Sequence, residues 1–252
     1  MAIFDMAGTV VDEQNLVYKT IQKSFQEKGF EVGLDKVFEA CAGKEKFFAI
    51  SSLLEVIAPH LSINQVGSDI FSNFKKSLVS AYQKEPVAPM PGSEEVFKYL
   101  SDRGILVVLN TGYDRTTADL LFQRMGWVKH PYIDDVITAT EVIHGRPAPD
   151  MIHLAMENAN IEDANQVIKI GDSQIDVEEG QNAGCQLSIG ITTGAHTREQ
   201  LLQAMPDAVL DHLNELVPLL EERKAIRFSH IPFFPSSRSG KPQARTSQSV
   251  KW

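Results

Sequence analysis

The stretch GILVVLNTGYDRTTADLLFQRMGW, at residues 104–127, decides how this chain is built. Its first half is a short aliphatic run, and its second half places apolar residues at helical spacing, which is typical of a buried strand followed by a helix. The same alternation continues in the order IDDVITA, APDMIHLAMENA, QVIKIGD, IDVEEGQNAG, CQLSIGIT and TREQLLQAM. Short apolar strands that alternate with helices predict an α/β fold around a parallel sheet that is covered on both faces.

The strand AIFD at residues 2–5 is separated from this pattern by the segment 13–89. That segment carries apolar residues at helical spacing, as in EKFFAISSLLEVIAPH. We therefore expect a small all-α domain inserted after the first strand, with residues 1–12 and 90–222 forming the α/β core. The segment 223–252 is rich in Ser, Pro and basic residues and lacks periodicity, so we expect it to be disordered.

The composition bounds the possible functions. The chain has 252 residues, of which 43% are hydrophobic, and a formal net charge of −9. An acidic protein of this kind is not expected to bind nucleic acid. Only the segment from residue 224 onward is basic, because it holds six Lys and Arg residues and no Asp or Glu.

Three features predict a cytoplasmic protein. Cys41 and Cys185 lie far apart and lack metal-ligand spacing, so we expect them to be reduced thiols. The first apolar run meets Asp5 after four residues, which is not expected of a signal peptide. The longest aliphatic run, ILVVL, is too short to span a membrane, so no membrane partner is expected.

Polar residues follow the ends of the expected strands. Asp5 ends the first strand in FDMAGT, and Thr111 ends the strand quoted at the start. Arg146 lies in HGRPAPD after the third core strand, and GDSQID places Asp172 and Asp176 after the fourth. Because ligands bind outside the carboxyl ends of parallel strands, we expect these side chains to form one site.

These residue types suit phosphoryl transfer. Asp5 can attack phosphorus and form an aspartyl-phosphate. The carboxylates of Asp5 and Asp172 would repel a phosphate unless a cation lies between them, and hard oxygen ligands suit Mg²⁺. The Thr111 hydroxyl and the Arg146 guanidinium can hold the equatorial phosphoryl oxygens. Asp176 lies one helical turn after Asp172 and can contact the same metal waters or pair with Arg146.

The order D-x-x-G-T, Thr, basic-P-x-P and G-D-x-x-x-D resembles the haloacid-dehalogenase superfamily of phosphohydrolases, over residues 1–222. The resemblance implies a Rossmann-like core, and the segment 13–89 is similar to the cap domain of that superfamily. It also implies Mg²⁺ held by Asp5, Asp172 and the main-chain carbonyl of Ala7, with Asp176 beside them. The substrate that it implies is a small phosphorylated or phosphonate metabolite.

Within the superfamily, DMAGT, TGY and GRPAPDM most resemble the phosphonatase-like branch. Members of that branch carry Ala at the position of Ala7, where phosphatases carry the acid that protonates the leaving group. They use a cap lysine in the pattern G-x-x-K to form a Schiff base with an aldehyde, and AGKEK supplies Gly43 and Lys46 at that spacing. The resemblance also assigns Gly112 and Tyr113 of TGY to the substrate site, and it implies a homodimer through the cap.

Ala7 fits a reaction in which the leaving group is carbon. If Lys46 condenses with a carbonyl next to a C–P bond, the iminium accepts the electrons of that bond and no acid is needed at position 7. Lys46 must then be neutral, so we expect burial or a nearby cation to lower its pKa. Ala49 stands where the phosphonatase has a histidine, which keeps open a phosphatase for good leaving groups. A non-catalytic phosphate-binding relative is the third interpretation.

Overall fold

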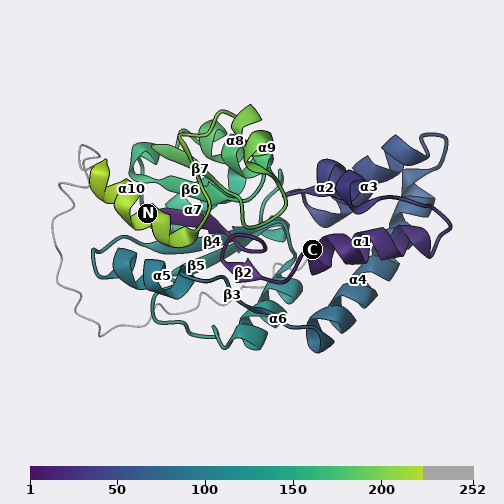
Figure 1. Ribbon diagram of the computed structural model, residues 1–252, viewed down its shortest axis with the longest axis horizontal. Helices are drawn as coiled ribbons and strands as arrows, with labels where there is room; N and C mark the ends of the chain where they lie inside the picture. Colours follow the sequence, from purple (N-terminus) through teal and green to yellow (C-terminus); the bar gives the residue numbers. More distant parts are fainter. Residues whose placement is uncertain (224–252) are drawn as a thin grey trace, which may run out of the picture.

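The chain folds into an α/β core with a group of helices beside it (Figure 1). The computed structural model describes residues 1–223. The disorder expected for the segment 223–252 therefore concerns residues that, apart from Arg223, lie outside the described range.

Within residues 1–223, six parallel strands form one sheet in the order β5-β4-β1-β6-β7-β8. The strands are β1 (Ala2–Asp5), β4 (Val107–Thr111), β5 (Asp135–Thr138), β6 (Ile168–Gly171), β7 (Leu187–Ile191) and β8 (Ala208–Leu210). The first strand of the chain lies between β4 and β6. A side chain at the carboxyl end of β1 is therefore flanked by the ends of two neighbouring strands.

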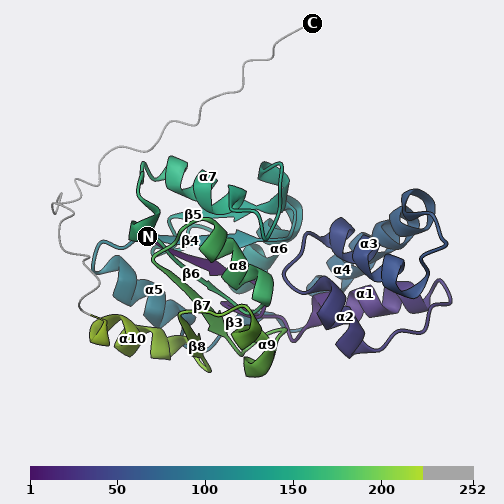
Figure 2. The ribbon, with the colours of Figure 1, turned by 90° about the horizontal axis from the view of Figure 1, so that it is seen from above.

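Helices cover both faces of this sheet, as the sequence predicts. They are α5 (Ser93–Ser101), α6 (Arg115–Met125), α7 (Asp150–Asn158), α8 (Gln174–Asn182), α9 (Arg198–Gln203) and α10 (Leu216–Glu222). Figure 2 shows α7 on one side of the strands and α5 with α10 on the other. The predicted fold class, an α/β fold with a parallel sheet between helices, is confirmed.

Successive residues of β1 explain why the strand is apolar throughout. Ile3 is fully buried in a cluster with Met151 and Ile152 of α7. Phe4 points to the opposite face, where its ring centroid lies 5.5 Å from that of Phe97 on α5. Because neighbouring side chains of a strand point to opposite faces, a sheet covered on both sides needs an unbroken apolar run.

The helices between β2 and β3 form a second group, here called the helical insert. It contains α1 (Leu16–Gln26), α2 (Leu34–Cys41), α3 (Lys46–Ile57), the π-helical turn η1 (Ile63–Gly67) and α4 (Ser68–Lys84). In the insert α1 packs against α4, and α2 packs against α3. The division into a cap 13–89 and a core with the expected bounds stays a prediction.

A short antiparallel ribbon joins the insert to the core. Its strands are β2 (Val11–Asp12) and β3 (Ala88–Pro89), in which Val11 pairs with Pro89 and Asp12 with Ala88. The chain thus leaves the core and returns to it at neighbouring points. Across residues 1–223, every helix falls short of the length and apolar character that crossing a membrane requires.

Candidate active site

The carboxyl ends of three neighbouring strands bring the expected side chains together. Asp5 ends β1 and Thr111 ends β4, while Asp172 directly follows β6. All three side chains are buried, with exposed fractions of 6%, 2% and 2%. The strand order therefore accounts for the convergence of motifs that lie far apart in the sequence.

Three carboxylates form a compact cluster in this region. Asp5, Asp172 and Asp176 each offer an oxygen within 4.8 Å of the other two. Ala7 lines the same cavity as Asp5 and Asp172. Gly8 follows at φ +87°, and a Cβ atom there would lie only 2.4 Å from Oδ2 of Asp172. Glycine is required at this turn because it tolerates both the positive φ and the close approach.

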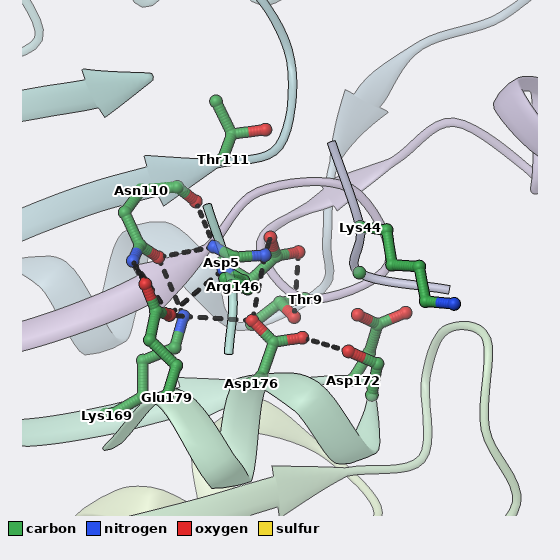
Figure 3. A network of polar contacts seen from close by, with 12 residues as sticks. Asp5, Thr9, Lys44, Asn110, Thr111, Arg146, Lys169, Asp172, Asp176 and Glu179 are labelled. Atoms are coloured by element: carbon green, nitrogen blue, oxygen red, sulfur yellow. Dashed lines mark hydrogen bonds and ion pairs between the residues drawn. The ribbon is translucent and has the colours of Figure 1, made fainter. Parts of the chain in front are cut away.

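Arg146 lies at the centre of the polar network (Figure 3). Its Nη1 is 2.7 Å from Oδ1 of Asp5 and 2.9 Å from Oδ1 of Asp176. Its Nη2 donates to the carbonyl and side-chain oxygens of Asn110, and its Nε lies 3.0 Å from Oε2 of Glu179. A phosphoryl oxygen would have to displace one of these partners. The role of Arg146 as a phosphoryl ligand stays a prediction, and its observed contacts orient Asp5 and Asp176.

Sequence reasoning missed three members of this network. Lys169 is fully buried on β6, with its Nζ 3.0 Å from Asp176 and 3.2 Å from Glu179. The Asn110 amide donates to both oxygens of Glu179, at 3.0 Å each, and its own oxygen accepts from Lys169 at 2.7 Å. A charged lysine inside the apolar run VIKIG was a signal, because such a residue needs a buried partner.

The charges in this cluster do not balance. Burial raises the pKa of Asp172 well above its usual range, and the nearby Asp5 and Asp176 add to the effect. Burial likewise raises the pKa of Asp5, against the influence of Arg146. For Asp176, Arg146 and Lys169 outweigh burial and lower the pKa.

The surplus of negative charge fits a divalent cation. Among the described residues, Arg146 and Lys169 contact three carboxylates, those of Asp5, Asp176 and Glu179, whereas Asp172 forms an ion pair with neither. Asp172 instead accepts a hydrogen bond from the Ala195 amide at 2.6 Å. An uncompensated buried carboxylate is costly, and oxygen ligands at this spacing suit Mg²⁺.

The helical insert contributes Lys46 to the same place. Lys46 begins α3, is 9% exposed, and lines one cavity together with Asp5 and Arg146. Its Nζ lies 4.9 Å from the centroid of the Tyr113 ring and donates to the Lys44 carbonyl at 2.9 Å. Burial lowers the pKa of Lys46, although Asp5 acts in the opposite direction.

Gly43 and Gly112 lie where the insert meets the core. A Cβ atom on Gly43 would lie 2.3 Å from Oγ of Ser173, which follows β6. A Cβ atom on Gly112 would lie 2.8 Å from the Lys44 carbonyl. Gly43 therefore lets the insert lie against the Ser173 side chain, and Gly112 lets the backbones of the core and the insert approach closely. Their expected contact with substrate stays a prediction.

A second buried chain of hydrogen bonds ends at Tyr113. The hydroxyls of Tyr113 and Tyr82 are 2.6 Å apart, and Tyr82 donates to Oε2 of Glu13 at 3.2 Å. Tyr82 comes from the end of α4, and Glu13 directly follows β2. The chain of bonds thus ties both connections of the insert to the loop after Thr111. Its members come from three distant parts of the sequence, and no motif marked Glu13 or Tyr82.

The cavity enclosed by these residues is small. Its volume is about 10 Å³ and its lining includes Asp5, Ala7, Lys46, Thr111 and Asp172. This is room for roughly one water molecule. In this conformation the insert therefore leaves this cavity no room for a molecule larger than water.

This fold and this order of motifs define a class of hydrolases. The haloacid dehalogenase-like hydrolase family matches residues 1–184 of the chain. The chain belongs to this family.

Its similarity to particular members is closer than the family match alone indicates. It is 30% identical to the phosphonoacetaldehyde hydrolase of Latilactobacillus sakei over 200 residues, covering 75% of this chain and 74% of that protein. It is 31% identical to the phosphonoacetaldehyde hydrolase of Lactiplantibacillus plantarum over 207 residues, covering 77% and 76%.

Solved structures support the fold. A phosphonoacetaldehyde hydrolase-like protein from Oleispira antarctica superposes with a TM-score of 0.77 at 23% identity, covering 90% of this chain and 94% of that one. A hydrolase from Pseudomonas syringae gives a TM-score of 0.74 at 16% identity, covering 88% and 97%. At these identities the likeness concerns the fold alone.

Proposed function

We propose that the protein is a Mg²⁺-dependent, phosphonatase-like hydrolase that cleaves the C–P bond of a small phosphonate such as phosphonoacetaldehyde. The observation that carries the proposal is that Lys46, from the helical insert, lines one cavity with Asp5, from the end of β1. Ala7 in the same lining offers no acid for an oxygen leaving group. The two phosphonoacetaldehyde hydrolases described above support the same substrate class.

Asp5 is the proposed nucleophile. Its Oδ1 is held by Arg146 at 2.7 Å, while the contact of its Oδ2 with the Thr9 hydroxyl is long, at 3.5 Å. The carboxylate is thus oriented while one oxygen is free of a strong partner, as a nucleophile requires. Thr111 at the end of β4 would donate to an equatorial phosphoryl oxygen.

Mg²⁺ would be held by Asp5, Asp172 and the main-chain carbonyl of Ala7, with Asp176 beside them. When bound it would neutralise charge on the phosphoryl group and on the carboxylates. Asp172 would be fixed for this role by the Ala195 amide.

Lys46 is the proposed electron acceptor. Burial lowers the pKa of its amine, and its place at the N-terminus of α3 also favours the neutral form, which can condense with a carbonyl next to the C–P bond. The iminium then takes up the electron pair of the C–P bond as phosphorus is transferred to Asp5.

The test compares phosphate and acetaldehyde release from phosphonoacetaldehyde, in the presence of Mg²⁺, by the native protein and Lys46→Ala. Lys44→Ala is the matched control, because Lys44 is a neighbouring lysine whose ammonium lies over Phe48, 5.4 Å from its ring centroid. We expect release to be lost in Lys46→Ala and retained in Lys44→Ala. Borohydride treatment with substrate should attach the two-carbon unit to Lys46 in the native protein.

The alternative is a phosphatase for substrates with good leaving groups. It predicts that the native protein and Lys46→Ala both fail to act on phosphonoacetaldehyde, and that both hydrolyse simple phosphate esters equally. A non-catalytic relative predicts no turnover of either substrate. Either result would overturn the proposal. The homodimer through the insert also stays a proposal, which sedimentation equilibrium tests.

A further inference from the structure

A second cavity adjoins the carboxylate site on the far side of Lys46. Its volume is about 300 Å³, which lies within the range of small-molecule binding sites. It opens between α3 and α4 of the insert and the loops after β4 and β5 of the core. The lining consists of Glu45, Lys46, Phe47, Phe71, Phe74, Lys75, Leu78, Tyr113, Asp114, Thr117 and Thr140.

Lys46 and Tyr113 line both this cavity and the carboxylate site. The two spaces therefore border each other at the side chains of Lys46 and Tyr113. The space at Asp5 is about 10 Å³, far smaller than the neighbouring cavity of about 300 Å³. With the carbonyl carbon at Lys46, the larger cavity is the neighbouring space into which a substituent on the far side of that carbonyl can extend.

The larger cavity has the character of an apolar pocket. The ring of Phe71 lies 5.4 Å from that of Phe47 and is stacked 6.3 Å from that of Phe74. Phe74 and Leu78 are each 2% exposed and form its floor on α4. Such a wall favours another ring, because aromatic pairs at this spacing attract beyond their buried area.

The carboxylates in the lining are already used by the backbone. Glu45 accepts from the amides of Phe47 and Phe48, and Asp114 accepts from the amide of Thr117. The ammonium of Lys75 lies over the Phe71 ring, 4.8 Å from its centroid. The cavity therefore offers aromatic surface, and both of its carboxylates are held by backbone amides at its edge.

We propose that this cavity receives an aromatic ring carried by the substrate, so that the preferred substrate class is aryl ketone phosphonates and not phosphonoacetaldehyde itself. The inference rests on the proposed function, because it places phosphorus at Asp5 and the carbonyl carbon at Lys46. A cavity of about 150 Å³ lined by apolar side chains is sufficient to take up benzene, so the space suffices for a phenyl group.

The reaction is balanced for 2-oxo-2-phenylethylphosphonate. Lys46 forms an iminium at the ketone with loss of water, and Asp5 then attacks phosphorus as the P–C bond breaks. The electron pair of that bond enters the iminium to give an enamine, which takes a proton at carbon. Water hydrolyses the resulting imine and the aspartyl-phosphate, so that substrate and one net water give acetophenone and inorganic phosphate.

The first measurement is binding, which does not depend on which bond is cleaved. Ethylphosphonate and 2-phenylethylphosphonate, neither of which has a carbonyl, are titrated calorimetrically into the native protein, Phe71→Ala and Phe48→Ala in the presence of Mg²⁺. Phe48 is the matched control, because it is 55% exposed on α3 and does not line the cavity. We expect the native protein to bind the phenyl compound at least about 10-fold more tightly. Phe71→Ala should reduce this preference about 5-fold, and Phe48→Ala should keep it.

The second measurement is phosphate release from phosphonoacetaldehyde and from 2-oxo-2-phenylethylphosphonate. A higher kcat/KM for the phenyl compound supports the inference together with the proposed function. If the phenyl compound binds more tightly but neither phosphonate releases phosphate, the cavity's role as a ring-binding site is supported and the proposed C–P cleavage is overturned. The proposal that the cavity receives a ring is overturned if the native protein binds the two carbonyl-free phosphonates equally. It is also overturned if Phe71→Ala and Phe48→Ala lose the preference for the phenyl compound to the same extent. Circular dichroism of each variant verifies that it is folded.

Discussion

Glu13 carries a buried carboxyl group whose ionisation the fold opposes. It is 2% exposed and accepts from the Val17 amide at 2.9 Å and from the Tyr82 hydroxyl at 3.2 Å. Burial raises its pKa from the ordinary value of 4.5 to about 7, although both hydrogen bonds act in the opposite direction. The folded and unfolded chains therefore bind the Glu13 proton with different strength, which makes stability depend on pH.

The sign follows from which state holds the proton. Between pH 4.5 and about 7 the folded chain keeps the proton that the unfolded chain has lost, so the free energy of unfolding falls as pH rises through this window. At 1.36 kcal/mol per pKa unit, the shift corresponds to about 3 kcal/mol. Below the window both states are protonated and above it both are ionised, so Glu13 adds no further slope.

Glu13→Gln removes the titration and keeps an oxygen acceptor for Val17 and Tyr82. Urea unfolding of native protein and variant is measured from about pH 5 to about pH 8. We expect the variant to gain up to about 3 kcal/mol on the native protein over this range, with most of the gain below pH 7. Comparison of the two proteins cancels the contributions of Asp5 and Asp172. Parallel stability curves would show that Glu13 is not titrating in this window.

Three further perturbations test the carboxylate site. Lys169→Met removes one of the two buried cations that contact Asp176 and Glu179 and leaves only Arg146, so the free energy of unfolding in urea should fall by about 3–5 kcal/mol, and a loss below about 1 kcal/mol contradicts the network. Gly8→Ala places a Cβ atom 2.4 Å from Oδ2 of Asp172 and should reduce kcat for phosphate release about 100-fold or more in a protein that still folds by circular dichroism, whereas an unchanged kcat contradicts the required close approach. Removal of divalent cations with EDTA should abolish phosphate release, and added Mg²⁺ should restore it; activity that persists in EDTA excludes the proposed metal role.

The elements that the sequence predicts well are those with local patterns. Each strand of the sheet is a short apolar run, and the side chains on both faces of β1 require that pattern. Asp5, Thr111 and Asp172 could be placed together because each stands at a strand end, and the ends of parallel strands meet at one edge of a sheet. Their chemical roles remain predictions that the experiments above test.

The contacts that could not be predicted depend on packing between distant segments. The sequence shows Lys169 as a charge within an apolar strand, and only the packing of α8 against β6 shows that Glu179 is its partner. Glu13 and Tyr82 are separated by the whole insert and meet only because β2 and β3 pair. The second cavity likewise forms only because α4 lies beside the loop that carries Tyr113. Helical spacing in the sequence assigns Phe71 only to an apolar helix face.

The β2–β3 ribbon divides the chain into two parts in which substitutions should have different effects. Asp12 and Ala88 are paired, so a tight turn could join these strands directly and leave the order of the six-stranded sheet unaltered. The segment between these two strands is therefore an insertion that the topology of the sheet does not require. Substitutions in α3 and α4 leave the strand that carries Asp5 and the loop that carries Asp172 in place, whereas exchange of the whole segment would also remove Lys46.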